Sequence, residues 1–76
     1  MRIAEVKPNK NHTLQIVSEN GNTGIFDVNP YLELEAFTDL KDQDAFKKVK
    51  NGGYFVEWEC GADLSADTIE AHLKTT

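Results

Sequence analysis

Cys60 and His72 are the two residues whose side chains could catalyse a reaction together. A thiol enzyme needs a cysteine, a neighbouring base and a group that orients the base, and Asp63 could take the last role. His72 lies twelve positions after Cys60, so the sequence permits their contact without requiring it. A cysteine after a strand and before a glycine is also typical of a small, half-buried packing residue. The thiol site therefore stays an alternative, and we expect no catalytic residues.

Carboxylates are frequent in the chain, but their spacing does not match a metal site. A calcium loop needs ligands at alternate positions, a central glycine and a terminal glutamate, and a zinc site needs histidine or cysteine at set intervals. Acids in the first turn of a helix are explained by capping and by the helix dipole. We therefore expect no metal and no cofactor at either group of acids: Asp39, Asp42 and Asp44, or Asp63, Asp67 and Glu70.

The basic residues gather in one stretch, at Lys41, Lys47, Lys48 and Lys50. With aromatic residues nearby, this stretch could form a small nucleic-acid patch. However, the chain has 13 acidic and 8 basic residues, which gives a net charge of −5, and an acidic field repels phosphate backbones. A solvated helix face is the simpler interpretation, so binding of nucleic acid by this domain alone stays a weak alternative.

An aromatic strand is the best candidate for a binding surface. Residues 54–59 alternate in character, so Tyr54, Val56 and Trp58 share one side, which we expect to be buried. Phe55 points the opposite way, among acidic residues, and is the aromatic side chain that we expect to be exposed. Exposed aromatic residues anchor many protein interfaces. The candidate interface is Phe55, Glu57, Glu59 and Asp63.

The composition indicates one small globular domain. A chain of 76 residues, 39% of them apolar, has room for a single core, and we expect residues 1–76 to form one domain. Since so small a core supplies little net stability, self-association into a homo-oligomer is a further hypothesis. One cysteine cannot form an intrachain disulfide, and no apolar run approaches the length of a membrane helix. We expect a cytoplasmic protein without membrane contact whose partners carry basic surfaces.

The first third of the chain predicts three antiparallel strands. Residues 2–7, 13–18 and 23–28 alternate at period two and are separated by polar turn sequences. Asn20-Gly21 favours a tight hairpin in which both central residues adopt positive φ. Residues 30–40 combine strand and helix spacing, so we expect a covering segment with a short helical turn there.

A short helix should follow the covering segment. Asp42 is a suitable N-cap, and Ala45, Phe46 and Val49 recur at three- and four-residue intervals, which places them on one side of a helix. Two lysines, at positions 47 and 48, would then lie in its last turn, where the helix dipole favours positive charge.

A second hairpin and a last helix complete the chain. Residues 51–53 turn it into the aromatic strand, and Asp63 or Ser65 can cap a helix whose apolar stripe is Ala66, Ile69 and Leu73. The predicted fold class is α+β: an antiparallel sheet built from a three-stranded N-terminal meander and a later hairpin, with one short helix between them and one C-terminal helix.

Taken together, these segments resemble the domain of unknown function 2442 family, a family of small bacterial domains. The resemblance extends from Ile3 to about Leu73 and rests on motifs spread along the chain, which are Val6-Lys7-Pro8, Leu14-Gln15-Ile16, Asn20-Gly21, Phe26-Asp27-Val28, Gly53 through Trp58, and Gly61-Ala62-Asp63-Leu64-Ser65.

The resemblance implies an α+β domain that occurs alone or joined to a helix-turn-helix domain, which we expect these 76 residues to lack. Such proteins are often encoded beside another small protein, in what looks like a toxin–antitoxin arrangement, and no catalytic residues are implied for them. Our leading hypothesis is therefore a non-catalytic interaction or regulatory module that binds a small bacterial companion with a basic surface, in the manner of an antitoxin.

Overall fold

Two antiparallel sheets form the framework of the protein, and this computed structural model describes residues 1–75. The first sheet contains four strands, which in spatial order are β1 (Ile3–Pro8), β2 (Thr13–Ser18), β3 (Thr23–Asp27) and β7 (Lys74–Thr75). Its first three strands form the meander predicted from the sequence, whereas the pairing of β7 with β3 was not predicted.

The second sheet contains three short strands, which in spatial order are β4 (Lys50–Asn51), β5 (Phe55–Glu57) and β6 (Asp63–Ser65). The predicted hairpin at residues 51–53 joins β4 to β5, and a further turn joins β5 to β6. The α+β class is confirmed. The later hairpin, however, belongs to a sheet of its own and does not extend the meander, because each of its strands is paired only within the second sheet.

The covering segment between the sheets is helical. It consists of two 3₁₀ helices, η1 (Asn29–Tyr31) and η2 (Glu35–Lys41), followed by α1 (Gln43–Phe46). Asp42 caps α1 as predicted, since its carboxylate accepts from the Asp44 backbone N–H at 3.0 Å. The helix is shorter than predicted and ends at Phe46, so the two following lysines lie beyond it and not in its last turn.

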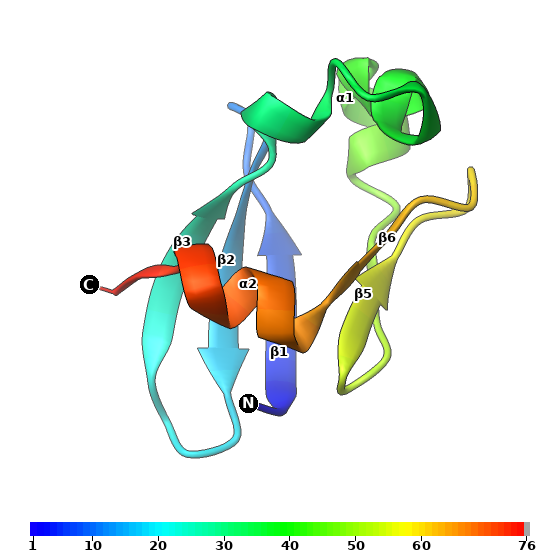
Figure 1. Cartoon of the computed structure of the whole chain (residues 1–76). Helices are drawn as coiled ribbons and strands as arrows, with labels where there is room; N and C mark the ends of the chain where they lie inside the picture. Colours follow the sequence, from blue (N-terminus) through cyan, green and yellow to red (C-terminus); the bar gives the residue numbers. More distant parts are fainter. Residues whose placement is uncertain (76) are drawn as a thin grey trace.

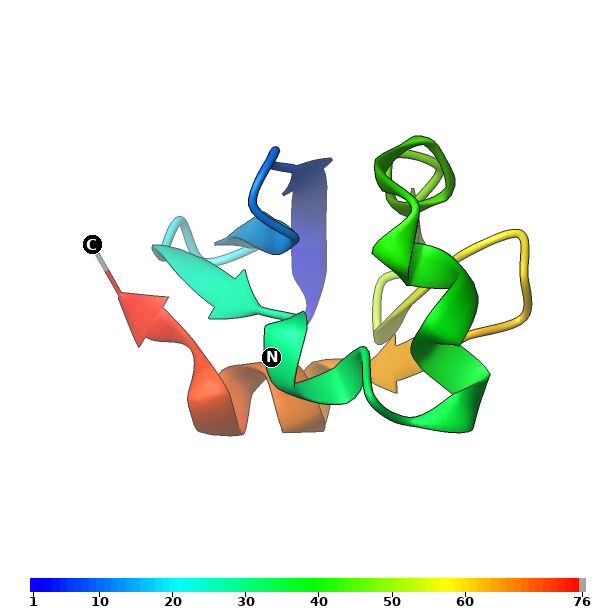
Figure 2. The ribbon, with the colours of Figure 1, turned by 90° about the horizontal axis from the view of Figure 1, so that it is seen from above.

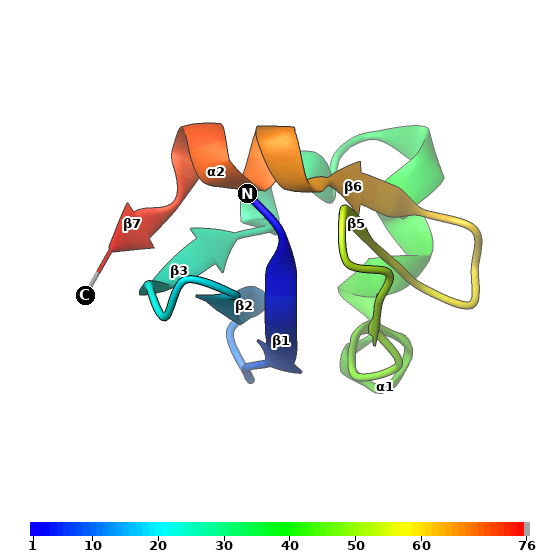
Figure 3. The same cartoon turned by 90° about the horizontal axis from the view of Figure 1, so that it is seen from below.

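A C-terminal helix connects the two sheets. This helix, α2 (Ala66–His72), is capped by Ser65, whose hydroxyl accepts from the Thr68 backbone N–H at 3.1 Å. Figure 1 shows α2 crossing the first sheet, and Figures 2 and 3 show that it lies on one face of that sheet. The chain then adds β7 beside β3. The segment from β6 to β7 therefore ties the second sheet to the far edge of the first.

The hairpin between β2 and β3 differs from the predicted turn. Within this hairpin only Gly21 has positive φ (+91°). The Gly21 N–H donates to the Ser18 carbonyl at 2.9 Å, and the Ser18 N–H donates to Asn22 at 2.8 Å. This pattern is a three-residue loop closed by a bulge. The expectation of positive φ at Asn20 is therefore wrong, since one left-handed residue suffices in this loop.

Trp58 joins the second sheet to the helical covering segment. Its indole Nε1–H donates to the Phe46 carbonyl oxygen at 2.9 Å, and both side chains are buried. The Trp58 ring lies 5.8 Å from the Phe46 ring and meets the Phe37 ring edge-on at 6.3 Å. The bond also satisfies a carbonyl at the end of α1, where helical partners are missing. Trp58, on the buried side of the aromatic strand, thus makes the central core contact with the covering segment.

Replacing Trp58 by alanine should therefore unfold or nearly unfold the protein. Loss of a buried aromatic side chain, together with the cavity that it leaves, costs about 3–5 kcal/mol. Trp58→Phe keeps most of the ring and removes the indole N–H, so the cost should fall to about 1–3 kcal/mol, the penalty for an unpaired carbonyl. Urea unfolding of both variants measures this order, and a cooperative, near-native transition in Trp58→Ala would contradict it.

Gly24 supplies the space that β7 needs. A Cβ at this position would lie 2.6 Å from the Leu73 Cγ and 2.9 Å from the Lys74 carbonyl oxygen. Gly24→Ala should therefore detach β7 from β3 and accelerate hydrogen exchange at the Ile25 amide, which faces Lys74 in the register. Gly21→Ala is the matched control: it costs about 1–2 kcal/mol through its positive φ, but its Cβ meets no atom within 4 Å. Equal exchange rates in the two variants would contradict this assignment.

Candidate functional site

The outer face of the second sheet carries most of the predicted interface. Glu57 lies directly opposite Asp63, and Phe55 lies directly opposite Ser65, in the register of β5 and β6. Residues that face each other across antiparallel strands project to the same side. The outer face is therefore defined as Lys50, Phe55, Glu57, Asp63 and Ser65, all of them exposed.

The opposite side of the same sheet belongs to the core. Val56 and Leu64 face each other there and are buried, together with Trp58. The predicted alternation is thus confirmed for Val56 and Trp58 on one side and for Phe55 on the other. Lys50 and Ser65 were not predicted as part of the interface. The pairing of β4 and β6 with β5 would have revealed them, but strands of two or three residues leave little periodicity to detect.

Phe55 is held in place although the residue is 40% exposed. Its ring lies against Gly52, where a Cβ would collide with the ring atoms. The Gly52 N–H also donates to the Phe55 carbonyl oxygen at 2.8 Å. The ring is therefore an apolar surface that packs against Gly52 and stays partly open to solvent.

Tyr54 does not share the buried side, contrary to the sequence expectation. It is 65% exposed, because β5 begins at Phe55 and Tyr54 lies in the preceding turn. The Arg2 guanidinium stacks on its ring at 5.4 Å and forms an ion pair with Glu19 at 2.9 Å. Tyr54 thus adds a second exposed aromatic residue next to the outer face.

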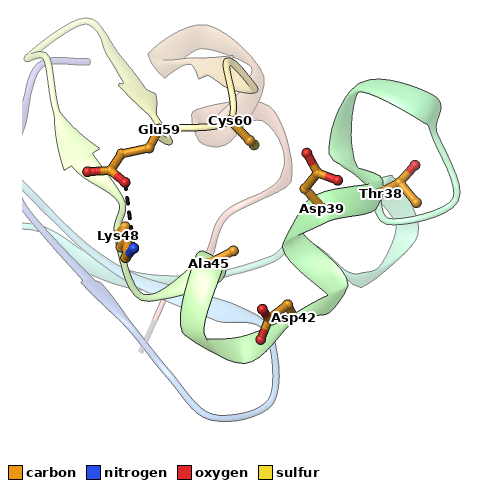
Figure 4. Close-up of a pocket in the computed structure, with 7 residues that line it drawn as sticks. All are labelled: Thr38, Asp39, Asp42, Ala45, Lys48, Glu59 and Cys60. Carbon is orange, nitrogen blue, oxygen red and sulfur yellow. Dashed lines mark ion pairs between the residues drawn. The ribbon is translucent and has the colours of Figure 1, made fainter.

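Glu59 lies apart from the outer face, in the loop after β5. It forms an ion pair with Lys48 at 3.7 Å and lines a surface hollow of about 590 Å³. Figure 4 shows this hollow, whose walls come from η2, α1 and the loop after β5. The lining residues are Thr38, Asp39, Asp42, Ala45, Lys48, Glu59 and Cys60.

The Cys60 thiol and the His72 imidazole line different hollows. Cys60 is exposed, so the expectation of a half-buried packing residue is wrong. His72 lines a different hollow with Tyr31 and Lys74, at the end of α2 that lies away from the loop carrying Cys60 in Figures 1 and 3. Asp63 lies on the outer face. The structure therefore does not bring together the three residues of the predicted thiol site.

The four lysines of the predicted nucleic-acid patch lie next to carboxylates. All are exposed, and Lys50 lies opposite Glu57 in the register of β4 and β5. Each ion pair reduces the positive charge that a phosphate would meet. The other three form ion pairs as follows: Lys41 with Glu33 at 3.9 Å, Lys47 with Asp44 at 4.0 Å, and Lys48 with Glu59 at 3.7 Å.

Two of the remaining acids make local contacts. Glu70 forms an ion pair with the N-terminal amine at 3.2 Å, and Asp42 is occupied as the cap of α1. Within residues 1–75, no three histidine, cysteine or acidic side chains are grouped in a way that could hold a metal ion. None of the helices described for this chain is long and apolar enough to span a membrane.

Comparison with known proteins identifies the family. The model of the family described as Protein of unknown function (DUF2442) matches residues 3–75, which is nearly the whole chain. No curated protein and no solved structure gives a significant match. The matched segment includes both sheets and the helices between them. The resemblance found in the sequence is confirmed, and the chain belongs to the DUF2442 family.

Proposed function

We propose that this protein is a non-catalytic interaction module whose outer face binds a basic surface on another protein. The observation that carries the proposal is the arrangement of Phe55, a positioned and exposed ring, beside the paired carboxylates of Glu57 and Asp63. An aromatic anchor at the centre with polar and charged residues at the rim is typical of protein interfaces. The net charge of −5 adds long-range attraction for a basic partner.

The carboxylate pair supports this proposal on energetic grounds. Glu57 and Asp63 carry like charges and lie directly opposite each other, an arrangement that destabilises a sheet. Lys50 faces Glu57 from the other neighbouring strand and offsets part of the repulsion. A cationic side chain from a partner would offset the rest. Binding would therefore relieve a repulsion that the free protein retains.

The biological form that we propose is an antitoxin-like regulatory partnership with a small companion protein in the bacterial cytoplasm. Support for a companion comes from the family resemblance, and support for the compartment comes from the single exposed thiol, which suits a reducing environment. The surface that would meet the companion is the outer face, together with Tyr54 beside it.

Reversing the charges of Glu57 and Asp63 should weaken binding strongly. In co-expression with the product of an adjacent gene, the native protein should co-elute with that product at low salt, and Glu57→Lys with Asp63→Lys should reduce the affinity at least tenfold. The control is Glu33→Lys with Asp44→Lys, which changes the net charge equally at side chains that are 83% and 87% exposed and lie off the outer face.

The control pair should bind as the native protein does. If none of several neighbouring gene products co-elutes with the native protein, the proposed partnership is refuted. Equal losses in both double variants would show that net charge alone governs association and that the outer face has no specific role.

Cys60 should behave as an ordinary exposed thiol. Activation of a cysteine requires a nearby base or uncompensated cation, and the hollow offers only Lys48, which is already paired with Glu59. Alkylation by iodoacetamide at pH 7 should therefore proceed at the rate of glutathione and should not change in His72→Ala. A rate ten times faster, or one that depends on His72, would instead favour a thiol enzyme.

A further inference from the structure

The second sheet ends at β6, and this edge adjoins the outer face. Asp63 and Ser65, the first and last residues of β6, are exposed, while Leu64 between them is buried. In the sheet order, β6 has β5 on one side and no described strand on the other. An edge of this kind presents backbone N–H and C=O groups that another chain can pair with.

The hydrogen bonds of the hairpin show which backbone groups point outward. The Trp58 N–H donates to the Ala62 carbonyl at 2.9 Å, and the Ala66 N–H donates to the Tyr54 carbonyl at 2.8 Å. Such bonds recur at every second residue of an antiparallel strand. The backbone of Leu64, midway between Ala62 and Ala66, therefore faces β5, and the N–H groups of Asp63 and Ser65 face away from the sheet.

The facing edges of the two sheets are linked to each other. The Ile3 N–H donates to the Gly53 carbonyl oxygen at 2.7 Å, and the Asn51 side-chain amide donates to the Ile3 carbonyl oxygen at 2.9 Å. These bonds connect β1 with the end of β4 and the turn that follows it. The β6 edge, by contrast, has no described strand beside it. It also carries Asp63, one residue of the like-charged pair on the outer face.

We infer that the partner adds an extended basic segment to β6 as a fourth strand of the second sheet. The inference rests on the proposed function and specifies how the partner binds. In a strand paired with β6, a lysine or arginine opposite Asp63 projects on the outer face. Neighbouring strands are about 4.8 Å apart, so its cationic group lies one strand from Asp63 and two strands from Glu57, within reach of both carboxylates.

The charge complementarity sets the chemistry of the segment. Side chains alternate along a strand, so basic residues at every second position would follow the outer face, while those between them point to the other side. The segment is short, since β6 has three residues. Its backbone supplies the hydrogen bonds, and its basic side chains supply the specificity, as in other cases of strand addition.

Proline at position 65 tests the edge without touching the charges. Ser65 has φ −73° and ψ 152°, which proline can adopt, and Leu64 before it is extended, as proline requires. Ser65→Pro removes the outward N–H and the capping hydroxyl, whereas Ser65→Ala removes the hydroxyl alone. The two variants therefore differ in the N–H that the added strand would use.

The probe is an acetylated and amidated octapeptide that alternates lysine and threonine, titrated at low salt and followed by amide chemical shifts. We expect shifts centred on β6 in the native protein, affinity within about twofold of native for Ser65→Ala, and at least a tenfold loss for Ser65→Pro. The same peptide N-methylated at alternate backbone nitrogens should also lose at least tenfold on the native protein, which keeps the test valid if Ser65→Pro does not fold.

The outcomes separate this inference from the proposed function. No shift at β6, or equal affinities of Ser65→Pro and Ser65→Ala, overturns the added strand. If the companion still co-elutes and still requires Glu57 and Asp63, the outer face binds its partner through side chains alone. If the peptide binds through β6 but no companion co-elutes, the edge accepts a basic strand and the antitoxin-like role fails.

Discussion

The hydrogen bond from the Trp58 indole to the Phe46 carbonyl is the contact on which the rest of the structure depends. The second sheet has strands of two or three residues, and sheets this short are not stable without packing against another layer. Trp58 provides that packing, because its ring contacts both Phe46 and Phe37 from the covering segment. The bond also fixes the ring orientation, which apolar packing alone would leave less defined.

This contact determines which side of the second sheet is available to a partner. Once Trp58 points inward, Val56 must share its side, because strand side chains alternate. Phe55 and Glu57 are then directed outward, and the register brings Asp63 beside Glu57. The functional surface proposed for the protein is thus a consequence of core packing: the residue that stabilises the fold also orients the residues that meet solvent.

Local patterns predicted much of this arrangement, and long-range pairing limited the rest. The meander, the Asp42 and Ser65 caps and the opposite directions of Phe55 and Trp58 follow from spacing and side-chain chemistry. The attachment of β7 to β3 depends on the path of α2 across the first sheet and on the space above Gly24, which no local pattern reveals. The same path carries His72 away from Cys60. The two residues therefore line different hollows, although their twelve-residue separation would permit contact.

The acidic character of the β6 edge favours a foreign strand over a second copy of this chain. Edge strands tend to pair with their own kind, and proteins often prevent this with charge and short length. Two copies joined through β6 would place the Asp63 carboxylates of both copies on neighbouring strands of the outer face, beside Glu57, so the repulsion already present there would increase. A basic segment paired with the same backbone groups would instead be attracted by these carboxylates. Specificity in such an edge comes as much from the pairing that it rejects as from the pairing that it accepts.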